Sequence, residues 1–322
     1  MIWISERSTF NSQVVRGRIQ AKHMPIPLSQ LDTWANQGGT GTSTAAYNSI
    51  RTALLKSTSP LANRGVEIFL QGSYANATNI HGDSDIDVVV LYDKTYCSDM
   101  RALTPAEQQL HQRLSTPATY LWSQLRDDVL TALRSHYGCH RATPGKKSIK
   151  VEITTGRRTS DVIPAIGFRR YATFVNHDNC TAHWGIQFFD SSSNPIVNCP
   201  KYHIERGENK NQQTRTRGQY KATIRLVKNF RNYLIDNGLL PDGVAPSYFI
   251  ECALHNVPDN LFIGTFTETV PAIIHYLSHT RYAGFLCQNG VVPLIGSGPT
   301  QWSAGDFATF VAAAKNAWDN WH

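Results

Sequence analysis

The sequence predicts a mixed α/β fold in two lobes, the first built on a mixed sheet and the second built from helices. Apolar, β-branched runs at residues 66–70 and 85–92 are typical of strands. After residue 213, apolar side chains recur at helical spacing instead. Residues 194–213, which are rich in Asn, Pro, Lys and Gln, indicate the boundary between the lobes.

Start and stop signals define the individual elements. Thr104, Pro105 and Glu107 combine an N-cap, a first-turn proline and a capping-box glutamate, so a helix begins there. Residues 38–42 form a Gly-rich connector that lacks the Gly-Lys-Ser/Thr ending of a P-loop. The remaining predicted elements are helices over residues 28–37, 43–56, 119–135, 219–237, 246–256, 267–279 and 303–321, and strands over residues 148–154 and 158–163 joined by a turn at Gly156.

Composition limits the classes of protein that the chain can represent. At 322 residues, with 41% hydrophobic and 17% charged residues, it is an ordinary globular sequence. We expect two domains, the sheet lobe over residues 1–205 and the helical lobe over residues 206–322. The formal net charge of +7 suits a polyanionic ligand, either nucleic acid or nucleoside triphosphates. No apolar run is long enough to cross a bilayer and the first residues do not resemble a signal peptide, so we expect a cytoplasmic protein without a membrane partner.

The six cysteines are scattered and form no Cys-x-x-Cys pair, which favours free thiols in a reducing compartment over a zinc ribbon. His177, Cys180, His183 and Cys199 could be imagined as one metal site. Their spacing matches no standard zinc site, so structural roles are favoured for them.

The segment from Gly72 to Asp87 carries the strongest chemical signal. Eleven residues separate Ser73 from Asp85, and Asp85 and Asp87 lead into an apolar strand. Residues two apart on a strand share a face, so these carboxylates lie roughly 6.5–7 Å apart along the chain. Oxygen ligands held that close favour Mg²⁺ or Mn²⁺, usually completed by substrate phosphates. The Gly-Ser turn allows a phosphate to approach the backbone and offers it an N–H and a hydroxyl.

Two-metal phosphoryl transfer needs one more carboxylate. Asp161 is a candidate because it lies on a strand with apolar neighbours, just before a proline that ends the strand. Glu152 on the preceding strand is the alternative.

A triphosphate also needs cationic partners. Lys221, Arg225 and Lys228 lie at i, i+4 and i+7 of a predicted helix and form a cationic stripe, although such a stripe is equally often just solvated. Ser247 follows Pro246 in the first turn of the next helix, where exposed N–H groups favour anions.

The combination of a Gly-Ser turn, a fixed gap and Asp-x-Asp before an apolar strand resembles the nucleotidyltransferase superfamily of DNA polymerase beta, CCA-adding enzymes and oligoadenylate synthetases. Further segments narrow the resemblance to bacterial cyclic-oligonucleotide synthases (CD-NTases), the relatives of cyclic GMP–AMP synthase, over about residues 43–254. These segments are residues 72–80, 84–87, 198–203, 210–211, 220–221, 225–228 and 246–248.

This resemblance implies a polymerase-beta-like core with a helical C-terminal lobe, two Mg²⁺ or Mn²⁺ ions per site, and ATP, GTP or other NTPs as substrates. It favours Asp161 over Glu152 as the third acid and makes Asp83 a turn residue. The implied active-site residues are Gly72, Ser73, Asp85, Asp87 and Asp161, with Lys228, Ser247 and Tyr248, and with Lys221 and Arg225 of the stripe, as nucleotide contacts. The implied product is a cyclic di- or oligonucleotide second messenger of anti-phage signalling, which a downstream effector protein would bind.

Two other functions stay open at this point. A linear polymerase or RNA-tailing enzyme would need an RNA-binding surface. We find no basic-aromatic RNA module in the sequence, and the basic segment at residues 141–150 is the candidate for such a surface. A catalytically inactive nucleotide or RNA sensor has little support because all three acids are present. A nucleic-acid partner is compatible with the sequence but not required by it.

Overall fold

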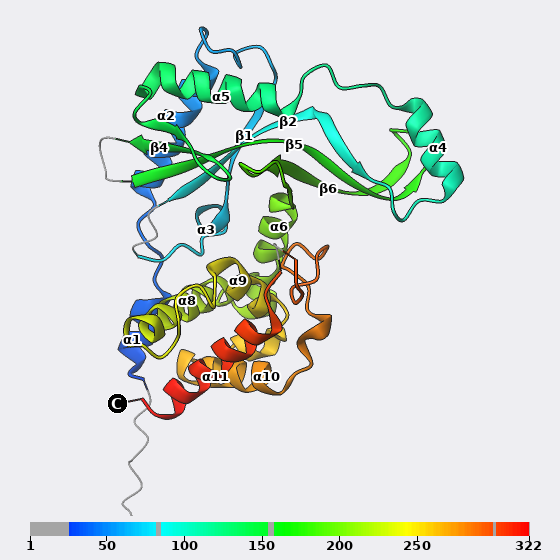
Figure 1. The fold of residues 1–322 in the computed structure, drawn as a ribbon. Coiled ribbons are helices and arrows are strands. Elements are labelled where there is room, and N and C mark those ends of the chain that lie inside the picture. The colour runs from blue at the N-terminus through cyan, green and yellow to red at the C-terminus, as the bar shows by residue number, and fades with distance from the viewer. Residues whose placement is uncertain (1–25, 82–84, 154–157, 299–300, 322) are drawn as a thin grey trace, which may run out of the picture.

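The computed structural model describes residues 26–81, 85–153, 158–298 and 301–321, and it has two lobes, a sheet lobe and a helical lobe (Figure 1). Within the described residues the sheet has seven strands, in the order β1-β2-β5-β4-β3, with β6 paired to β5 and β7 paired to β6. The strands are β1 (Glu67–Gln71), β2 (Ile86–Asp99), β3 (Ala142–Pro144), β4 (Ile149–Ile153), β5 (Arg158–Phe174), β6 (Cys180–Phe189) and β7 (Pro195–Asn198).

The two faces of the sheet have different neighbours. The alternate side chains Val88, Val90, Val151 and Val162 are fully buried in one core with residues of α2 (Gly41–Leu55) and α5 (Trp122–Tyr137). In Figure 1, α5 lies on the side of the sheet away from the helical lobe. Because side chains alternate along a strand, the residues between these valines project from the opposite face, on the side of the helical lobe.

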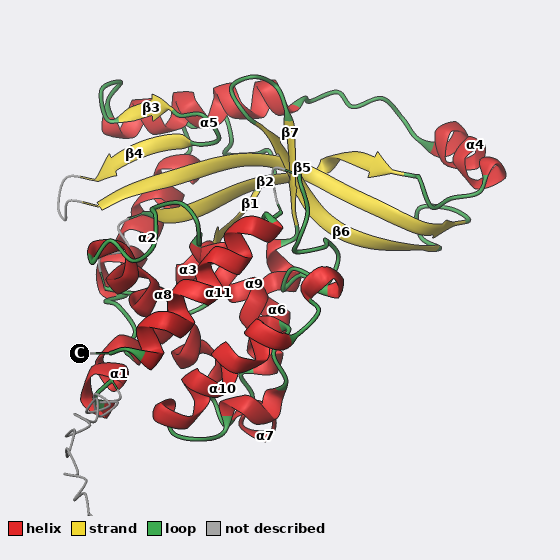
Figure 2. Ribbon diagram, turned by 60° about the horizontal axis from the view of Figure 1, so that its bottom comes forward, coloured by secondary structure: helices red, strands yellow, loops and turns green. Residues whose placement is uncertain are grey.

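The strands β2, β5 and β6 continue past the helical lobe as an arm, with α4 (Pro105–Leu114) at its far end (Figure 2). A β-bulge or irregularity shifts the β2–β5 register between Tyr92 and Tyr96, and the pairing then resumes. Strand β2 therefore continues to Asp99 and β5 to Phe174, so the predicted strands that stop at residues 92 and 163 are too short. The arm carries polar residues, such as Lys94, that broke the apolar pattern.

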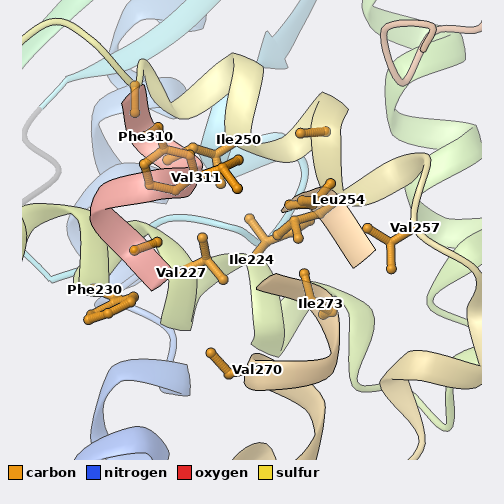
Figure 3. Close-up of a cluster of buried hydrophobic side chains, with 14 of the residues drawn as sticks. Ile224, Val227, Phe230, Ile250, Leu254, Val257, Val270, Ile273, Phe310 and Val311 are labelled. Carbon is orange, nitrogen blue, oxygen red and sulfur yellow. The ribbon is translucent and has the colours of Figure 1, made fainter. Parts of the chain in front are cut away.

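The helical lobe packs around α8 (Tyr220–Asp236). Figure 3 shows Ile224, Val227 and Phe230 of α8 in a cluster with side chains from the other helices. The other helices of this lobe are α1 (Leu28–Ala35), α7 (Gln213–Thr216), α9 (Ser247–His255), α10 (Phe266–His279) and α11 (Ala304–Asp319), with short 3₁₀ turns at Asp259–Phe262 and Tyr282–Gly284.

The predicted division of the chain into two domains at residue 205 stays a prediction. Two features of the packing bear on where the lobes meet. That position lies inside α6 (Pro200–Lys210), which runs between the lobes (Figure 1). In addition, Leu31 and Ala35 of α1 belong to the core of the helical lobe, although α1 precedes the whole sheet in the sequence.

Most predicted helices are confirmed to within a few residues, including the Thr104 capping box. Strands β3, β6 and β7 and helix α6 are not among the predicted elements, and the predicted boundary at residues 194–213 contains β7 and α6. The reason is clear for α6, because its buried face consists of Pro200, His203, Gly207 and Lys210 rather than large apolar side chains. The Gly156 turn lies outside the described residues. Over the described part of the chain, we find no helix with the length and apolar character needed to cross a membrane.

Candidate active site

The sheet places two of the predicted acids side by side. The strands β2 and β5 pair in parallel, and the register sets Asp87 directly beside Asp161. Residues paired in this way project from the same face of the sheet, here the face on the side of the helical lobe. Asp85 lies two residues before Asp87 and accepts a hydrogen bond from the Thr159 hydroxyl. The Ser148 hydroxyl donates to Asp161 Oδ1 at 2.7 Å.

The register places both candidates for the third carboxylate on the same face of the sheet. Asp161 lies directly beside Asp87, and Glu152 of β4 lies beside Thr159, two residues before Asp161. Asp161 is the nearer of the two to Asp87, and its role as the third acid stays a prediction. Asp83 lies outside the described residues.

The environment of Asp87 shows how strongly negative charge is concentrated here. Its pKa is raised to about 7, mainly by burial and then by the nearby carboxylates of Asp161 and Asp85. Three carboxyl groups offer only oxygen atoms, the ligands that Mg²⁺ and Mn²⁺ prefer, so the donor set fits a hard divalent cation. Within the described residues, no three His, Cys, Asp or Glu side chains are already arranged as a metal cluster. The case for a metal site therefore depends on the strand register that brings Asp87 beside Asp161 and on the concentrated negative charge of the acids.

Gly72 brings the predicted phosphate-binding segment against these acids. It begins the single helical turn α3 (Gly72–Ala75) with a φ of +71°, a left-handed conformation that favours glycine. A Cβ atom at this position would lie 2.5 Å from Asp87 Oδ2. The Asn76 side chain donates to the Gly72 carbonyl at 2.9 Å and holds the turn. Only glycine lets the backbone approach the Asp87 carboxylate this closely.

A cavity of about 280 Å³ opens between the lobes at this point. Six predicted site residues contribute to its lining: Gly72, Ser73 and Asp87 from the sheet lobe, and Lys228, Ser247 and Tyr248 from the helical lobe. Its other lining residues are Gln71, Asn76, Asn198, Pro200, His203, Ile204 and Glu251. The structure thus brings together segments that are up to 180 residues apart in the chain, and the roles of the individual side chains stay predictions.

Lys228 is one of the residues that line the cavity, and its side chain is fully buried. Its ammonium donates to Glu251 Oε1 at 2.6 Å and to the Thr78 carbonyl at 3.1 Å. Glu251 also accepts from the Thr78 hydroxyl at 2.7 Å and pairs with His203 Nε2 at 3.0 Å. Burial alone would raise the pKa of Glu251, but Lys228 and His203 hold it well below its ordinary value. The charge of Lys228 is therefore already balanced.

The expected cationic stripe of α8 needs correction for its other two members. The Lys221 ammonium is paired with Glu208 and its side chain is only 8% exposed. Arg225 donates to the carbonyls of Ala35 at 2.7 Å and Ala77 at 2.6 Å. Neither side chain contributes to the lining of the cavity. Both cations bind other groups of the fold, so the cavity gives no support to their predicted nucleotide contacts.

Ser247 and Tyr248 begin α9 at the rim of the cavity, and the Ser247 hydroxyl accepts from Arg231 at 3.2 Å. The Tyr248 ring stacks on the His203 ring, with 5.4 Å between the ring centroids and an interplanar angle of 24°. His203, Glu251 and Asn76 also line the cavity but are not among the site residues predicted from the sequence. A signal for His203 existed in the 198–203 segment, whereas Glu251 could not be found because its partners come from both lobes.

An acidic sheet edge, a glycine turn against it, and an interlobe cavity together define a nucleotidyltransferase. The chain matches two family models: "Nucleotidyltransferase domain" over residues 51–136, and "cGAS/DncV-like nucleotidyltransferase C-terminal helical domain" over residues 205–319. It therefore belongs to the cGAS/DncV-like nucleotidyltransferase (CD-NTase) family and is a cyclic nucleotide synthase.

Named relatives agree with this assignment. The cyclic UMP-AMP synthase of Rhodothermus marinus is 39% identical over 92% of this chain and 99% of its own length. The cyclic nucleotide synthase CdnE01 of Staphylococcus haemolyticus is 35% identical over 92% of this chain and 100% of its own.

The fold of the R. marinus CdnE c-UMP-AMP synthase, solved with Apcpp and Upnpp, matches with a TM-score of 0.83 over 92% of this chain and 98% of that one, at 39% identity. The Elizabethkingia meningoseptica CdnE cyclic dinucleotide synthase, solved with GTP and Apcpp, matches with a TM-score of 0.72 at 28% identity, over 90% of this chain and 98% of that one.

Proposed function

We propose that this enzyme joins two nucleoside triphosphates into a cyclic dinucleotide and releases two pyrophosphates. The observation that carries the proposal is the pairing of Asp87 with Asp161 at the edge of a cavity that both lobes line. A hydroxyl of an acceptor nucleotide attacks the α-phosphorus of a donor NTP, the bond to the β-phosphate breaks, and pyrophosphate leaves. A second attack within the linear intermediate closes the ring.

The described residues support distinct roles for the two sides of the cavity. On the sheet side, Gly72 lets the donor triphosphate approach the backbone, and Ser73 offers it a hydroxyl. On the helical side, Ser247 would donate to a phosphate oxygen, and the face of the Tyr248 ring that is not stacked on His203 would stack on a base. Both residues line the cavity, which supports these roles. Positioning of this kind supplies much of the catalysis in phosphoryl transfer.

Asp85, Asp87 and Asp161 would hold two Mg²⁺ or Mn²⁺ ions. Bound there, such ions neutralise phosphate charge and make a hydroxyl more nucleophilic. The raised pKa of Asp87, about 7, supports this role, because a carboxyl group surrounded by other carboxylates lacks a positive partner.

The biological setting is also a proposal. We place the reaction in the cytoplasm, where a cyclic second messenger for anti-phage signalling would reach an effector protein that binds it. UTP and ATP are the first substrate pair to test, because the 39% identical relative is named for a product of uridine and adenosine nucleotides.

The test is an incubation of the purified protein with four labelled NTPs and Mg²⁺ or Mn²⁺, followed by phosphatase, nuclease digestion and mass spectrometry. We expect a small product that resists phosphatase, and no product from Asp87→Asn. Phosphatase-sensitive products longer than a tetramer would assign the chain to linear polymerases. The absence of any turnover would favour the inactive sensor.

A further inference from the structure

A single row of side chains crosses four strands of the sheet at the candidate active site. The register pairs Gln71 of β1 with Asp87, Asp87 with Asp161, and Asp161 with Lys150 of β4. Register partners project from the same face, so Lys150 shares the face of the two acids. Ile149, its neighbour in β4, is fully buried in the core on the α5 side, which agrees with this direction.

Lys150 has the reach to act at the reaction centre. It is exposed, and Cβ atoms of register partners lie about 4.5–5.5 Å apart, so a lysine stem can carry its ammonium past the Asp161 carboxylate. The cavity with Gly72 and Ser73 lies on the other side of Asp161, next to Asp87. Across the sheet, the order is therefore donor cavity, Asp87, Asp161, Lys150.

This order gives an acceptor nucleotide room on the Lys150 side of the acids. If the donor occupies the cavity and the attacking hydroxyl lies at the acids, the rest of the acceptor extends beyond Asp161. The acceptor is itself a triphosphate, so its negative charge would lie close to a carboxylate unless a cation offsets it. An ammonium on a flexible stem acts as a point charge for phosphate oxygens.

We propose that Lys150 binds the 5′-phosphates of the acceptor nucleotide, an inference that rests on the proposed cyclic dinucleotide synthesis. The competing role is structural, with Lys150 only holding the charge of Asp161. The two roles differ in one respect: a phosphate contact matters only when the acceptor carries phosphates.

The experiment compares Lys150→Met with wild type and with Lys147→Met, which removes an exposed lysine of the turn before β4, outside the row. Each protein receives the same donor NTP and either the acceptor NTP or the corresponding nucleoside, and pyrophosphate release and product mass are recorded. With the acceptor NTP, Lys150→Met should lose about 10- to 100-fold in kcat/KM, mainly through KM. With the nucleoside, it should match wild type within about 2-fold.

Further variants and outcomes separate the possibilities. Lys150→Arg, which keeps the charge, should restore most of the activity with the acceptor NTP, and Lys147→Met should behave as wild type. An equal loss with both acceptors would show that Lys150 acts through Asp161, and no loss with either would make it a solvated lysine. Both results overturn the inference while wild-type product formation upholds the proposed function. A wild-type protein that forms no dinucleotide would refute the proposed function itself.

Discussion

Replacing Gly72 by alanine should disable the enzyme without unfolding it, and a second glycine of the same chain provides the control. Gly72 has a φ of +71°, and Gly238, which follows α8, has a φ of +68°. A Cβ atom at Gly238 would find nothing within 4 Å, whereas at Gly72 it would lie 2.5 Å from Asp87 Oδ2. The two substitutions therefore share the backbone strain and differ in the contact with the carboxylate.

The structure gives the size of both effects. Holding alanine in the left-handed region costs about 1–2 kcal/mol, which should lower the Tm of either variant by a few degrees. An ordinary contact begins near 3.4 Å, so in Gly72→Ala the Asp87 carboxylate has to move by about 1 Å. Misplacement of a reacting group by about 1 Å can cost about 100-fold in rate.

The assay is pyrophosphate release with saturating NTPs, together with thermal unfolding of both variants. We expect Gly238→Ala to keep wild-type kcat and Gly72→Ala to lose about 100-fold or more, at a similar loss of Tm. Wild-type kcat in Gly72→Ala would refute the reasoning, because it would mean that the position of Asp87 against the turn is not needed. A matching loss in Gly238→Ala would trace the effect to general destabilisation.

Three further predictions concern the acids and the buried ion pair. Asp85→Asn and Asp161→Asn should each lose nearly all turnover with an unchanged circular dichroism spectrum, and substantial product from either folded variant would contradict its role. Asp87 has a folded pKa of about 7 against an ordinary value of 3.8, so its contribution to stability is present below about pH 4 and lost as the pH rises through 7. Asp87→Asn should therefore raise the Tm in EDTA at pH 8 more than at pH 5 while abolishing activity, and an equal Tm difference at both pH values would exclude the raised pKa. Glu251→Gln should lower the free energy of unfolding by about 3–5 kcal/mol because it leaves the buried Lys228 ammonium without a carboxylate, and an unchanged urea midpoint would exclude the pair.

The sequence is sufficient to predict that Asp85 and Asp87 share a face, because this depends only on neighbouring residues. Asp85 and Asp87 precede a run of β-branched residues, so the strand and the shared face of both side chains follow from period two alone. Asp161 could be proposed for similar reasons. Its distance from Asp87 could not, because that depends on which strand of the sheet pairs with β2.

The cations were harder to interpret because helical spacing shows which side chains share a face but not what they contact. Lys228 lies on the predicted face of α8, yet its carboxylate partner is 23 residues further on, and Thr78 comes from the other lobe. Arg225 bonds to backbone carbonyls, which leave no trace in the sequence. A long-range polar network of this kind appears only once the lobes are assembled.

The parallel pairing of β2 and β5 limits how the length of this chain can change. Asp87 and Asp161 are 74 positions apart, and deletions in the arm between them would leave their alignment intact. A deletion of one residue between 162 and 166, with the rest of β5 still paired to β2, would shift Asp161 by one place and turn it toward the core under α5. A deletion of two would restore its face but move it by about 7 Å along the strand. Insertions and deletions should therefore be tolerated in the arm and excluded at the start of β5.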